Sequence, residues 1–367
     1  MGKKNNDNSS EYFYISINSS STFLNGFTSG SLSDPKMFSR SHKSWVKSLS
    51  MSRKEFLFSD KDKAIIPGPL SHGISLFGAL DILSNGGTLN ILKENKNNKK
   101  ILDIIVKENI TVIILVPTKL DILCDVAQKN KMNSVLKIVS AGSKLSDHTR
   151  QKALITFPNA EIIEYYGASE LSFVSVAKSK ENCPTNSVGR PFSGVTIDIR
   201  DANGKSLKQG QVGEIWVKSD MICDDYSSSS EGGKFKVDGS WATVGDIGRL
   251  DQNNFLFLSK RTDSIITSAG HTIDLASIED KLKEFPGIKE AIVTSITHKR
   301  WGEIIVAMIV PYINNLINEF ILNEYCKLYI EVYSHPKLWH FTDKIPLTSS
   351  GKINYSSIKK KFQNKKF

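Results

Sequence analysis

The sequence has 367 residues, of which 40% are hydrophobic, 23% charged and 9% aromatic, and its formal charge at pH 7 is +10. This composition is typical of globular proteins and argues against a disordered chain or an integral membrane protein. Because a single hydrophobic core seldom grows beyond ~250–300 residues, a chain of this length is expected to form a large domain and a smaller one.

The chain begins with MGKKNNDNSSEYF, a polar stretch without the apolar segment of a secretory signal. Next comes FTSGSLSDPK at residues 27–36, in which small hydroxyl side chains surround a glycine and a lysine closes the stretch. Backbone N–H groups and hydroxyls in such a loop can hold phosphate oxygens, while the lysine neutralises their charge. The spacing is not that of a Walker loop, and an ordinary surface turn is the alternative interpretation.

The middle of the chain alternates helical and extended patterns. A helix-like KKILDIIVKENI at residues 99–110 precedes the extended TVIILVP at 111–117, and a second strand pattern, LKIVSAG, follows at 136–142. This alternation is typical of βαβ units, in which parallel strands are connected by helices. We therefore expect a large domain with a parallel-rich sheet and helices.

Beyond about residue 190 the pattern changes to short strands separated by turn residues, which predicts a β-rich subdomain over about 190–258. From residue 259 a helix that ends at Pro-Gly is followed by a strand and by the apolar GEIIVAMIVPYI, which predicts a small α+β domain. The expected fold class is α/β plus α+β, with a large domain at 1–258 and a small, mobile C-terminal domain at 259–367.

Much of the positive charge lies at the C-terminal end. The last 16 residues include no acid and six lysines, namely Lys352, Lys359, Lys360, Lys361, Lys365 and Lys366. No basic run is interleaved with aromatic residues, so we expect no nucleic-acid partner. The four cysteines are far apart without a CxxC pair, which predicts neither a zinc site nor a disulfide framework and favours a cytoplasmic protein.

Four further motifs follow the loop at 27–36 in a fixed order. They are YYGASE at 165–170, TVGDIGRLD at 243–251, SKRTDSIITSAGHTI at 259–273 and PLTSSGKI at 346–353. The ordered set resembles the acyl-adenylate-forming, or AMP-binding, superfamily of acyl-CoA synthetases, luciferases and peptide-synthetase adenylation domains. The resemblance runs from about residue 12 to about 361.

Within that superfamily the chain is most similar to bacterial putative long-chain fatty acid–CoA ligases. Adenylation domains of peptide synthetases resemble it less, because they usually have an aspartate near the position of PLSHGISL, residues 69–76, which contains no acid here. The resemblance implies ATP, Mg²⁺ and coenzyme A as cofactors and a carboxylic acid, expected to be a fatty acid, as substrate.

The resemblance also implies roles for individual residues. The residues that would hold the β- and γ-phosphates of ATP are Thr28, Ser29, Gly30, Ser31 and Lys36. Tyr166 would stack on adenine, Gly167 would also contact the nucleotide, and Ser169 would reach the α-phosphate. Glu170 would bind Mg²⁺, since a carboxylate that shares the ion with phosphates and water is chemically sufficient. An ordinary surface carboxylate is the alternative for Glu170.

By the same resemblance, Asp246 would accept hydrogen bonds from both ribose hydroxyls and Arg261 would support the ribose. Lys352 would stabilise the negative charge that develops as the acid attacks the α-phosphorus. His72 would lie against the substrate carboxylate, although a histidine satisfied within the core is the alternative. Gly142 would border the acyl pocket beside adenine.

Two positions concern the second half of the implied reaction. Asp263 matches the hinge between the domains, where backbone rotation would move the small domain, and Gly270 would line the tunnel for the thiol. In the first step the carboxylate attacks ATP to give acyl-AMP and pyrophosphate. In the second step a thiol such as that of coenzyme A displaces AMP.

The sequence departs from the family pattern in three ways. Leu32 and Ser33 replace a hydroxyl residue and a glycine of the phosphate loop, and Thr272 replaces a frequent arginine. Members also normally have a longer region before the phosphate loop. These departures leave open a catalytically silent binding or interaction protein, and an amino-acid-adenylating domain is a further alternative. The basic tail suggests peripheral contact with an anionic membrane.

Overall fold

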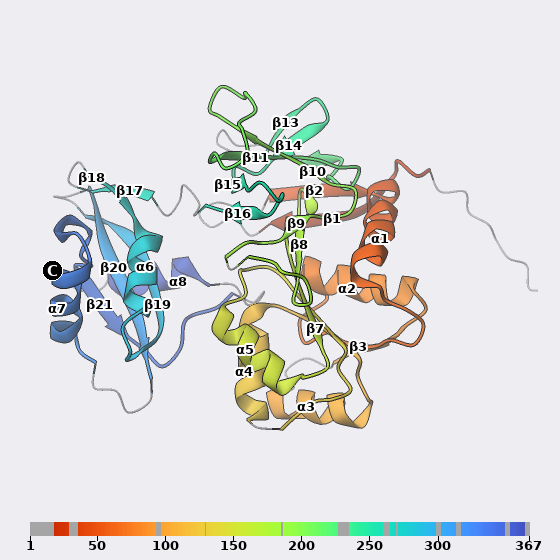
Figure 1. The fold of residues 1–367 in the computed structure, drawn as a ribbon, viewed down its shortest axis with the longest axis horizontal. Coiled ribbons are helices and arrows are strands. Elements are labelled where there is room, and N and C mark those ends of the chain that lie inside the picture. The colour runs from red at the N-terminus through yellow and green to blue at the C-terminus, as the bar shows by residue number, and fades with distance from the viewer. Residues whose placement is uncertain are drawn as a thin grey trace, which may run out of the picture.

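The computed structural model describes residues 18–28, 36–92, 97–128, 130–184, 186–226, 235–259, 265–268, 271–298, 302–312, 317–348 and 353–363. They form a large lobe and a separate small lobe (Figure 1). Among the described residues, the buried clusters of the large lobe extend to Leu256, and those of the small lobe begin at Ile266. We propose that the domain boundary lies between them, at the predicted position of 258/259.

A seven-stranded sheet forms the centre of the large lobe, in the order β4-β3-β5-β6-β7-β8-β9. Its strands are β3 (Lys63–Ile65), β4 (Thr88–Asn90), β5 (Val112–Leu115), β6 (Lys137–Ser140), β7 (Glu161–Ala168), β8 (Ser172–Lys178) and β9 (Arg190–Pro191). The first five strands of the sheet are parallel, and β8 and β9 add antiparallel pairs at one edge. The predicted parallel-rich sheet is therefore confirmed.

Helices cover both faces of this sheet (Figure 1). One face carries α3 (Asn98–Lys107), α4 (Pro117–Ala127) and α5 (Asp147–Thr156), and the other carries α1 (His42–Phe56) and α2 (Gly73–Ser84). Because alternate side chains of β5 enter different helical layers, all of its residues are buried. This burial on two faces explains the continuous apolar run at 112–115.

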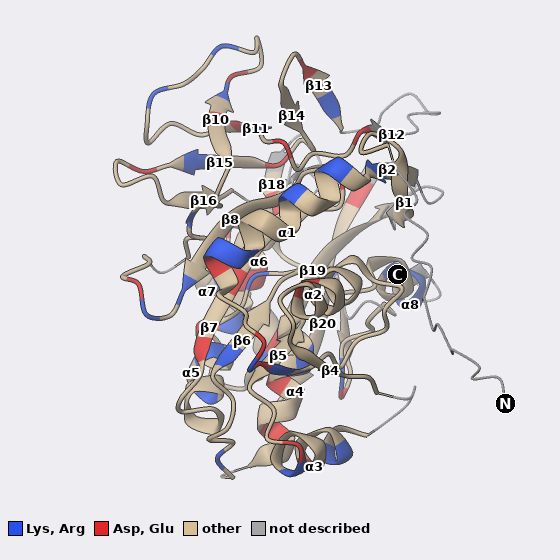
Figure 2. Ribbon diagram, turned by 90° about the vertical axis from the view of Figure 1, so that its right-hand side faces the viewer, with Lys and Arg blue, Asp and Glu red and all other residues tan. Residues whose placement is uncertain are grey.

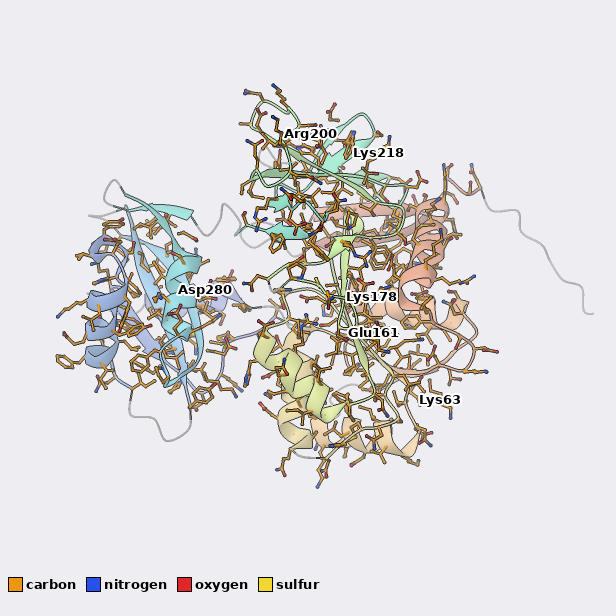
Figure 3. The ribbon with its side chains drawn as sticks, viewed as in Figure 1. Lys63, Glu161, Lys178, Arg200, Lys218 and Asp280 are labelled. Carbon is orange, nitrogen blue, oxygen red and sulfur yellow. The ribbon has the colours of Figure 1, made fainter. Side chains whose placement is uncertain are left out.

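Two further sheets complete the large lobe. The β-rich part contains β10 (Thr196–Arg200), β11 (Gly213–Lys218), β13 (Lys236–Asp238), β14 (Trp241–Thr243), β15 (Ile247–Leu250) and β16 (Leu256–Leu258). Arg200 lies in this sheet (Figure 3), where its guanidinium stacks over the rings of Trp216 and Trp241. The predicted β-rich subdomain is confirmed.

The third sheet has the order β1-β2-β12, with β1 (Thr22–Thr28), β2 (Lys36–Ser41) and β12 (Asp225–Tyr226). Within the described residues, β1 pairs with β2 alone and so lies at an edge. Phe27 and Met37 face each other across this pair, and both side chains are exposed. The sheet therefore presents apolar side chains beside an unpaired strand edge.

The small lobe has the predicted α+β composition. Its strands are β17 (Ile265–Ser268), β18 (His271–Asp274), β19 (Ile288–His298), β20 (Gly302–Pro311) and β21 (Leu338–Phe341), and its helices are α6 (Leu275–Lys283), α7 (Glu319–Tyr329), α8 (Tyr355–Gln363) and the short 3₁₀ helix η2 (Val332–Ser334). α6 and α7 cover one face of the β19-β20-β21 sheet, and α8 covers the other. None of the helices described in either lobe is long and apolar enough to cross a membrane.

Candidate nucleotide and acid site

Two residues predicted to hold adenosine meet in the structure. Tyr166 lies near the end of β7, and Asp246 lies between β14 and β15. The phenol Oη of Tyr166 donates a hydrogen bond of 2.6 Å to Oδ2 of Asp246, which is only 8% exposed. This distance lies within the range of well-formed hydrogen bonds between two oxygens. The arrangement places an aromatic ring beside a carboxylate that can accept from neighbouring hydroxyls.

The turn before Asp246 is held by a residue that sequence reasoning missed. The hydroxyl of Thr243, which is fully buried, accepts a hydrogen bond of 3.0 Å from the backbone N–H of Gly245. Gly245 has a φ of +75°, a conformation that a glycine adopts without steric cost. The carbonyl of Asp246 accepts from the N–H of Ile215, so the turn is also fixed to β11. A hydroxyl two residues before a glycine is the local signal that could have identified Thr243.

The predicted residues Ser169 and Glu170 lie at the tip of the β7–β8 hairpin. Ala168 and Ser172 face each other across the base of this tip. A Cβ atom on Gly167 would lie 2.1 Å from the carbonyl oxygen of Ser172, so no larger residue fits there without backbone movement. The carbonyl of Glu170 accepts a hydrogen bond of 2.8 Å from the N–H of Cys223. The hairpin tip is therefore tightly packed and anchored.

Glu170 is the only carboxylate predicted for a metal ion, and the described residues include no cluster of three or more groups that could bind one. A Mg²⁺ ion usually keeps several waters and binds one or two carboxylates together with substrate phosphates. A single glutamate at a hairpin tip fits this type of shared coordination.

The loop that follows β6 is anchored to the neighbouring strand. Gly142, two residues after the strand ends at Ser140, has a φ of +97°. The buried carboxylate of Glu164 in β7 accepts hydrogen bonds from the N–H of Leu145 at 2.8 Å, from Arg150 at 2.9 Å and from Lys144 at 3.2 Å. Because the carboxyl ends of parallel strands meet at one edge of a sheet, Gly142 and the hairpin tip lie at the same edge.

His72 precedes the first turn of α2. Its Nε2 atom is buried and has no hydrogen-bond partner among the residues that the structure describes. A buried polar atom without a partner is unfavourable unless a ligand or water completes its hydrogen bonds. This nitrogen is available to a water or a ligand oxygen, and both interpretations of His72, contact with the substrate carboxylate and a histidine satisfied within the core, stay predictions.

The remaining predicted residues are described only in part. For Thr28 and Lys36 the structure describes the backbone, in which the two residues pair across β1 and β2 and bring the ends of the intervening loop together. The predicted residues that lie outside the described ranges are Ser29, Gly30, Ser31, Arg261, Asp263, Gly270 and Lys352. Leu32 and Ser33 of the loop also lie outside those ranges.

The sequence pattern of AMP-binding enzymes matches residues 7–227, and that of the C-terminal domain of AMP-binding enzymes matches residues 277–352. The chain belongs to the AMP-binding enzyme family. The predicted family is therefore confirmed, and the ordered motifs lie in the two regions or in the segments beside them.

Individual relatives of this AMP-binding enzyme agree with that result. It is 37% identical over 339 residues to the uncharacterized acyl-CoA ligase YhfT of Bacillus subtilis strain 168, covering 92% of this chain and 68% of that protein. It is 31% identical to the putative long chain fatty acid-CoA ligase VraA of Staphylococcus haemolyticus, covering 91% and 69%. Among solved structures, o-succinylbenzoate CoA synthetase (MenE) from Bacillus subtilis, in complex with its acyl-adenylate intermediate OSB-AMP, is 25% identical with a TM-score of 0.74, covering 94% and 70%.

Proposed function

We propose that this AMP-binding enzyme is an acid–thiol ligase that activates a carboxylic acid with ATP. The carboxylate oxygen attacks the α-phosphorus, pyrophosphate leaves, and acyl-AMP forms. The sulfur of a thiol then attacks the acyl carbon and releases AMP. The observation that carries this proposal is the hydrogen bond between Tyr166 and Asp246, which unites two motifs that are 80 residues apart in the sequence.

Each of the described site residues has a separate binding role in the first step of this proposal. We propose that Tyr166 stacks on adenine with Gly167 beside it, and that Asp246 accepts from the ribose hydroxyls, because an ionised carboxylate has two acceptor oxygens. The hydroxyl of Ser169 donates to the α-phosphate. The buried Nε2 of His72 approaches the substrate carboxylate, and Gly142 borders the pocket at the same edge of the sheet.

The other assignments rest on the family resemblance. Lys36 and the residues Thr28, Ser29, Gly30 and Ser31 would hold the terminal phosphates, and a Mg²⁺ ion held by Glu170 would neutralise phosphate charge. Arg261 would support the ribose, and Lys352 would stabilise charge at the reacting phosphate. Asp263 would act as the hinge, and Gly270 would line the thiol tunnel.

The proposed acid is a fatty acid, and the proposed thiol is coenzyme A. Support comes from the relatives described as acyl-CoA and long chain fatty acid-CoA ligases. The segment 69–76 around His72 contains no carboxylate that could pair with the amino group of an amino acid. A fatty acid, which has no such amino group, is therefore the better match.

The test is acid-dependent exchange of pyrophosphate into ATP by the full chain, with a panel of short to long fatty acids and amino acids. We expect exchange with fatty acids and its loss in Lys352→Ala. Lys344→Ala removes an exposed lysine of the same lobe and serves as the matched control. Exchange with amino acids alone would replace the proposed substrate class, and a folded protein without any exchange would point to a silent binding protein.

We further propose that the basic C-terminal segment contacts anionic membrane, where long fatty acids partition. Figure 2 marks the basic residues of α8 in blue. Ile358 and Phe362 of this helix are fully buried against the small lobe, so truncation at residue 359 would damage the core. A variant that replaces Lys359, Lys360 and Lys361 with glutamine removes the charge and keeps the buried side chains of the helix.

Vesicle sedimentation provides the measurement for this proposal. We expect the triple variant to bind vesicles of anionic phospholipid more weakly than the parent chain does, because each lysine near such a surface contributes about 1 kcal/mol. The same change at Lys99, Lys100 and Lys107 of α3 is the control. Equal binding by both variants and the parent would rule out this contact.

A further inference from the structure

Arg40 is a buried arginine in β2, four residues after Lys36. Its side chain is only 4% exposed, and its guanidinium donates all of its hydrogen bonds inside the large lobe. The acceptors are Oγ of Ser48 at 2.8 Å, the carbonyl of Met221 at 2.8 Å, the carbonyl of Ser44 at 3.1 Å, Oγ of Ser172 at 3.3 Å and Oγ of Ser44 at 3.4 Å. One side chain thus joins β2, α1, β8 and the segment before β12.

These contacts are unusual for a buried cation, because every acceptor of Arg40 among the described residues is an uncharged oxygen. Burial lowers the pKa of Arg40 to about 10, while nearby Cys223 and Asp224 act in the opposite direction. The guanidinium therefore stays protonated at neutral pH. Replacing it with a side chain that has fewer donors would leave buried oxygens without partners, which is unfavourable.

Ser172 is the acceptor nearest to the proposed nucleotide site. It has a φ of +62°, in the left-handed region that non-glycine residues rarely adopt, and it closes the hairpin tip that carries Ser169 and Glu170. Its hydroxyl contacts both Arg40 and the hydroxyl of Ser48, which lies 3.2 Å away. A strained backbone persists only when its surroundings hold it in place. Arg40 is one of the groups that hold it.

The second connection runs through the segment at 221–224. Arg40 binds the carbonyl of Met221, and two residues later the N–H of Cys223 donates to the carbonyl of Glu170. Asp224 then accepts from the hydroxyl of Ser41 at 3.0 Å, at the start of α1. Arg40 therefore holds both segments that fix the backbone of Glu170.

We propose that Arg40 is a positioning residue for MgATP. It fixes the position of the hairpin tip, which carries Ser169 and Glu170, relative to β2, the strand that follows the phosphate loop in the sequence. This inference rests on the proposed function, since it assigns the tip to the α-phosphate and to Mg²⁺. It predicts that Arg40 controls the affinity for MgATP without contacting the nucleotide and without affecting the affinity for the acid.

The test compares Arg40→Lys with Arg53→Lys. Lysine retains the positive charge, but its single ammonium group cannot donate at once to the acceptors in β8, in α1 and in the segment at 221–224. Arg53 is an exposed arginine of the same helix-and-strand unit that binds Asn85 and the carbonyl of Ser84, away from the hairpin tip. Calorimetric titration of the full chain with MgATP gives the dissociation constant. Exchange kinetics give the KM values for ATP and for the acid.

For Arg40→Lys we expect a dissociation constant and a KM for MgATP that rise about tenfold, with an unchanged KM for the acid, since hydrogen bonds from charged groups have effects of this size. Arg53→Lys should match the parent chain. Unchanged affinity for MgATP in a folded Arg40→Lys protein would overturn the inference. An equal rise in both KM values would do the same, because it would indicate general loss of structure.

If Arg40→Lys fails to fold, Ser172→Ala decides the question. It removes only the hydroxyl that Arg40 and Ser48 hold, and we expect it to weaken MgATP binding severalfold, whereas unchanged binding would overturn the inference. The proposed function fails separately, when the parent chain binds MgATP but exchanges no pyrophosphate. In that case the comparison of dissociation constants still decides the role of Arg40. A parent chain that binds no MgATP would overturn both the proposed function and the role of Arg40.

Discussion

The carboxyl group of Asp81 in α2 is fully buried, and its environment only partly satisfies it. Oδ1 accepts from the side-chain amide of Asn85 at 3.1 Å, whereas Oδ2 has no hydrogen-bond partner within the described ranges. Burial raises the pKa of Asp81 to about 7, although the nearby hydroxyl of Ser52, the amide of Asn85 and the charge of Arg53 act in the opposite direction. The neutral acid is therefore the form that the folded protein favours.

This shift predicts how stability depends on pH. Because the pKa of Asp81 is about 7 in the folded protein and 3.8 in the unfolded chain, the folded protein binds the additional proton between these values. The free energy of unfolding should fall relative to that of Asp81→Asn by about 2 kcal/mol between pH 5 and pH 7. Urea denaturation at both pH values measures it. The control is Asp103→Asn at an exposed position of α3, and a pH-independent difference for Asp81→Asn would refute the prediction.

Tyr166→Phe isolates the hydrogen bond between the phenol and Asp246. The substitution keeps the aromatic ring and removes the donor that lies 2.6 Å from Oδ2. We expect the KM for ATP to rise about two- to tenfold, the effect of one hydrogen bond, while the KM for the acid stays constant. Steady-state exchange kinetics test this expectation. Tyr329→Phe, on the exposed surface of α7, is the matched control, and equal effects of the two substitutions would contradict the role of the pair.

At the scale of elements, Glu164 joins β7 to the loop and helix that follow β6. Its carboxylate is 2% exposed and accepts from Leu145, Lys144 and Arg150. Glu164→Gln should lower the free energy of unfolding by about 2 kcal/mol, because two cations then lose their counter-charge but remain partly hydrated. It should also slow exchange, because the loop with Gly142 loses its anchor.

Denaturant titration and exchange assays measure both effects of Glu164→Gln. The matched control is Glu161→Gln at the start of the same strand, whose position is labelled in Figure 3. An unaltered free energy of unfolding in Glu164→Gln would mean that the backbone alone determines the loop conformation.

α1 connects several of these features. Lys178, labelled in Figure 3, lies at the end of β8, and its Nζ is 2.8 Å from the carboxylate of Glu55 near the C-terminal end of α1. Ser44 and Ser48 of the same helix accept hydrogen bonds from Arg40. Sequence reasoning did not predict this helix. Its buried face mixes Trp45, Met51 and Phe56 with Ser44, Ser48 and Ser52. The buried serines interrupt the apolar periodicity by which a helix is recognised in a sequence.

At the scale of the whole molecule, an ion pair crosses between the lobes. Nζ of Lys289 in the small lobe lies 3.7 Å from Oδ2 of Asp125 in α4, and both side chains are 45% exposed. Exposed pairs of this kind contribute at most about 1 kcal/mol and weaken with salt. The lobes can therefore change orientation at low cost to this contact, as the proposed hinge at Asp263 requires.

Lys289→Glu should reduce the population of the present lobe arrangement, because it places two carboxylates opposite each other. Small-angle X-ray scattering at low salt should then deviate from the profile calculated for this structure, and 0.5 M salt should diminish the deviation. Lys281→Glu, where the lysine pairs with Glu284 inside the small lobe, is the control. Identical profiles for Lys289→Glu and the parent chain would mean that this pair does not affect lobe orientation.

The accuracy of sequence reasoning differed between core and site. The strand at 112–115 and the helix before it were predictable because burial on two faces leaves continuous apolar runs. The contact between Tyr166 and Asp246 could be expected only through a family resemblance, since nothing local relates positions 80 residues apart. Arg40 escaped notice because it lies in the continuous polar run SRSHK at residues 39–43, and such residues are usually exposed.

The edge formed by β1 will govern how the protein behaves at high concentration. Within the part of the chain that the structure describes, one edge of β1 has no partner strand, and this edge, beside exposed Phe27 and Met37, can bond to the same edge of another copy and so start aggregation. The formal charge of +10 opposes this association through repulsion between copies, and salt shortens the range of that repulsion to about 10 Å at 0.1 M. Purification at low ionic strength should therefore keep the protein dispersed, and Phe27→Lys should raise its solubility limit in salt.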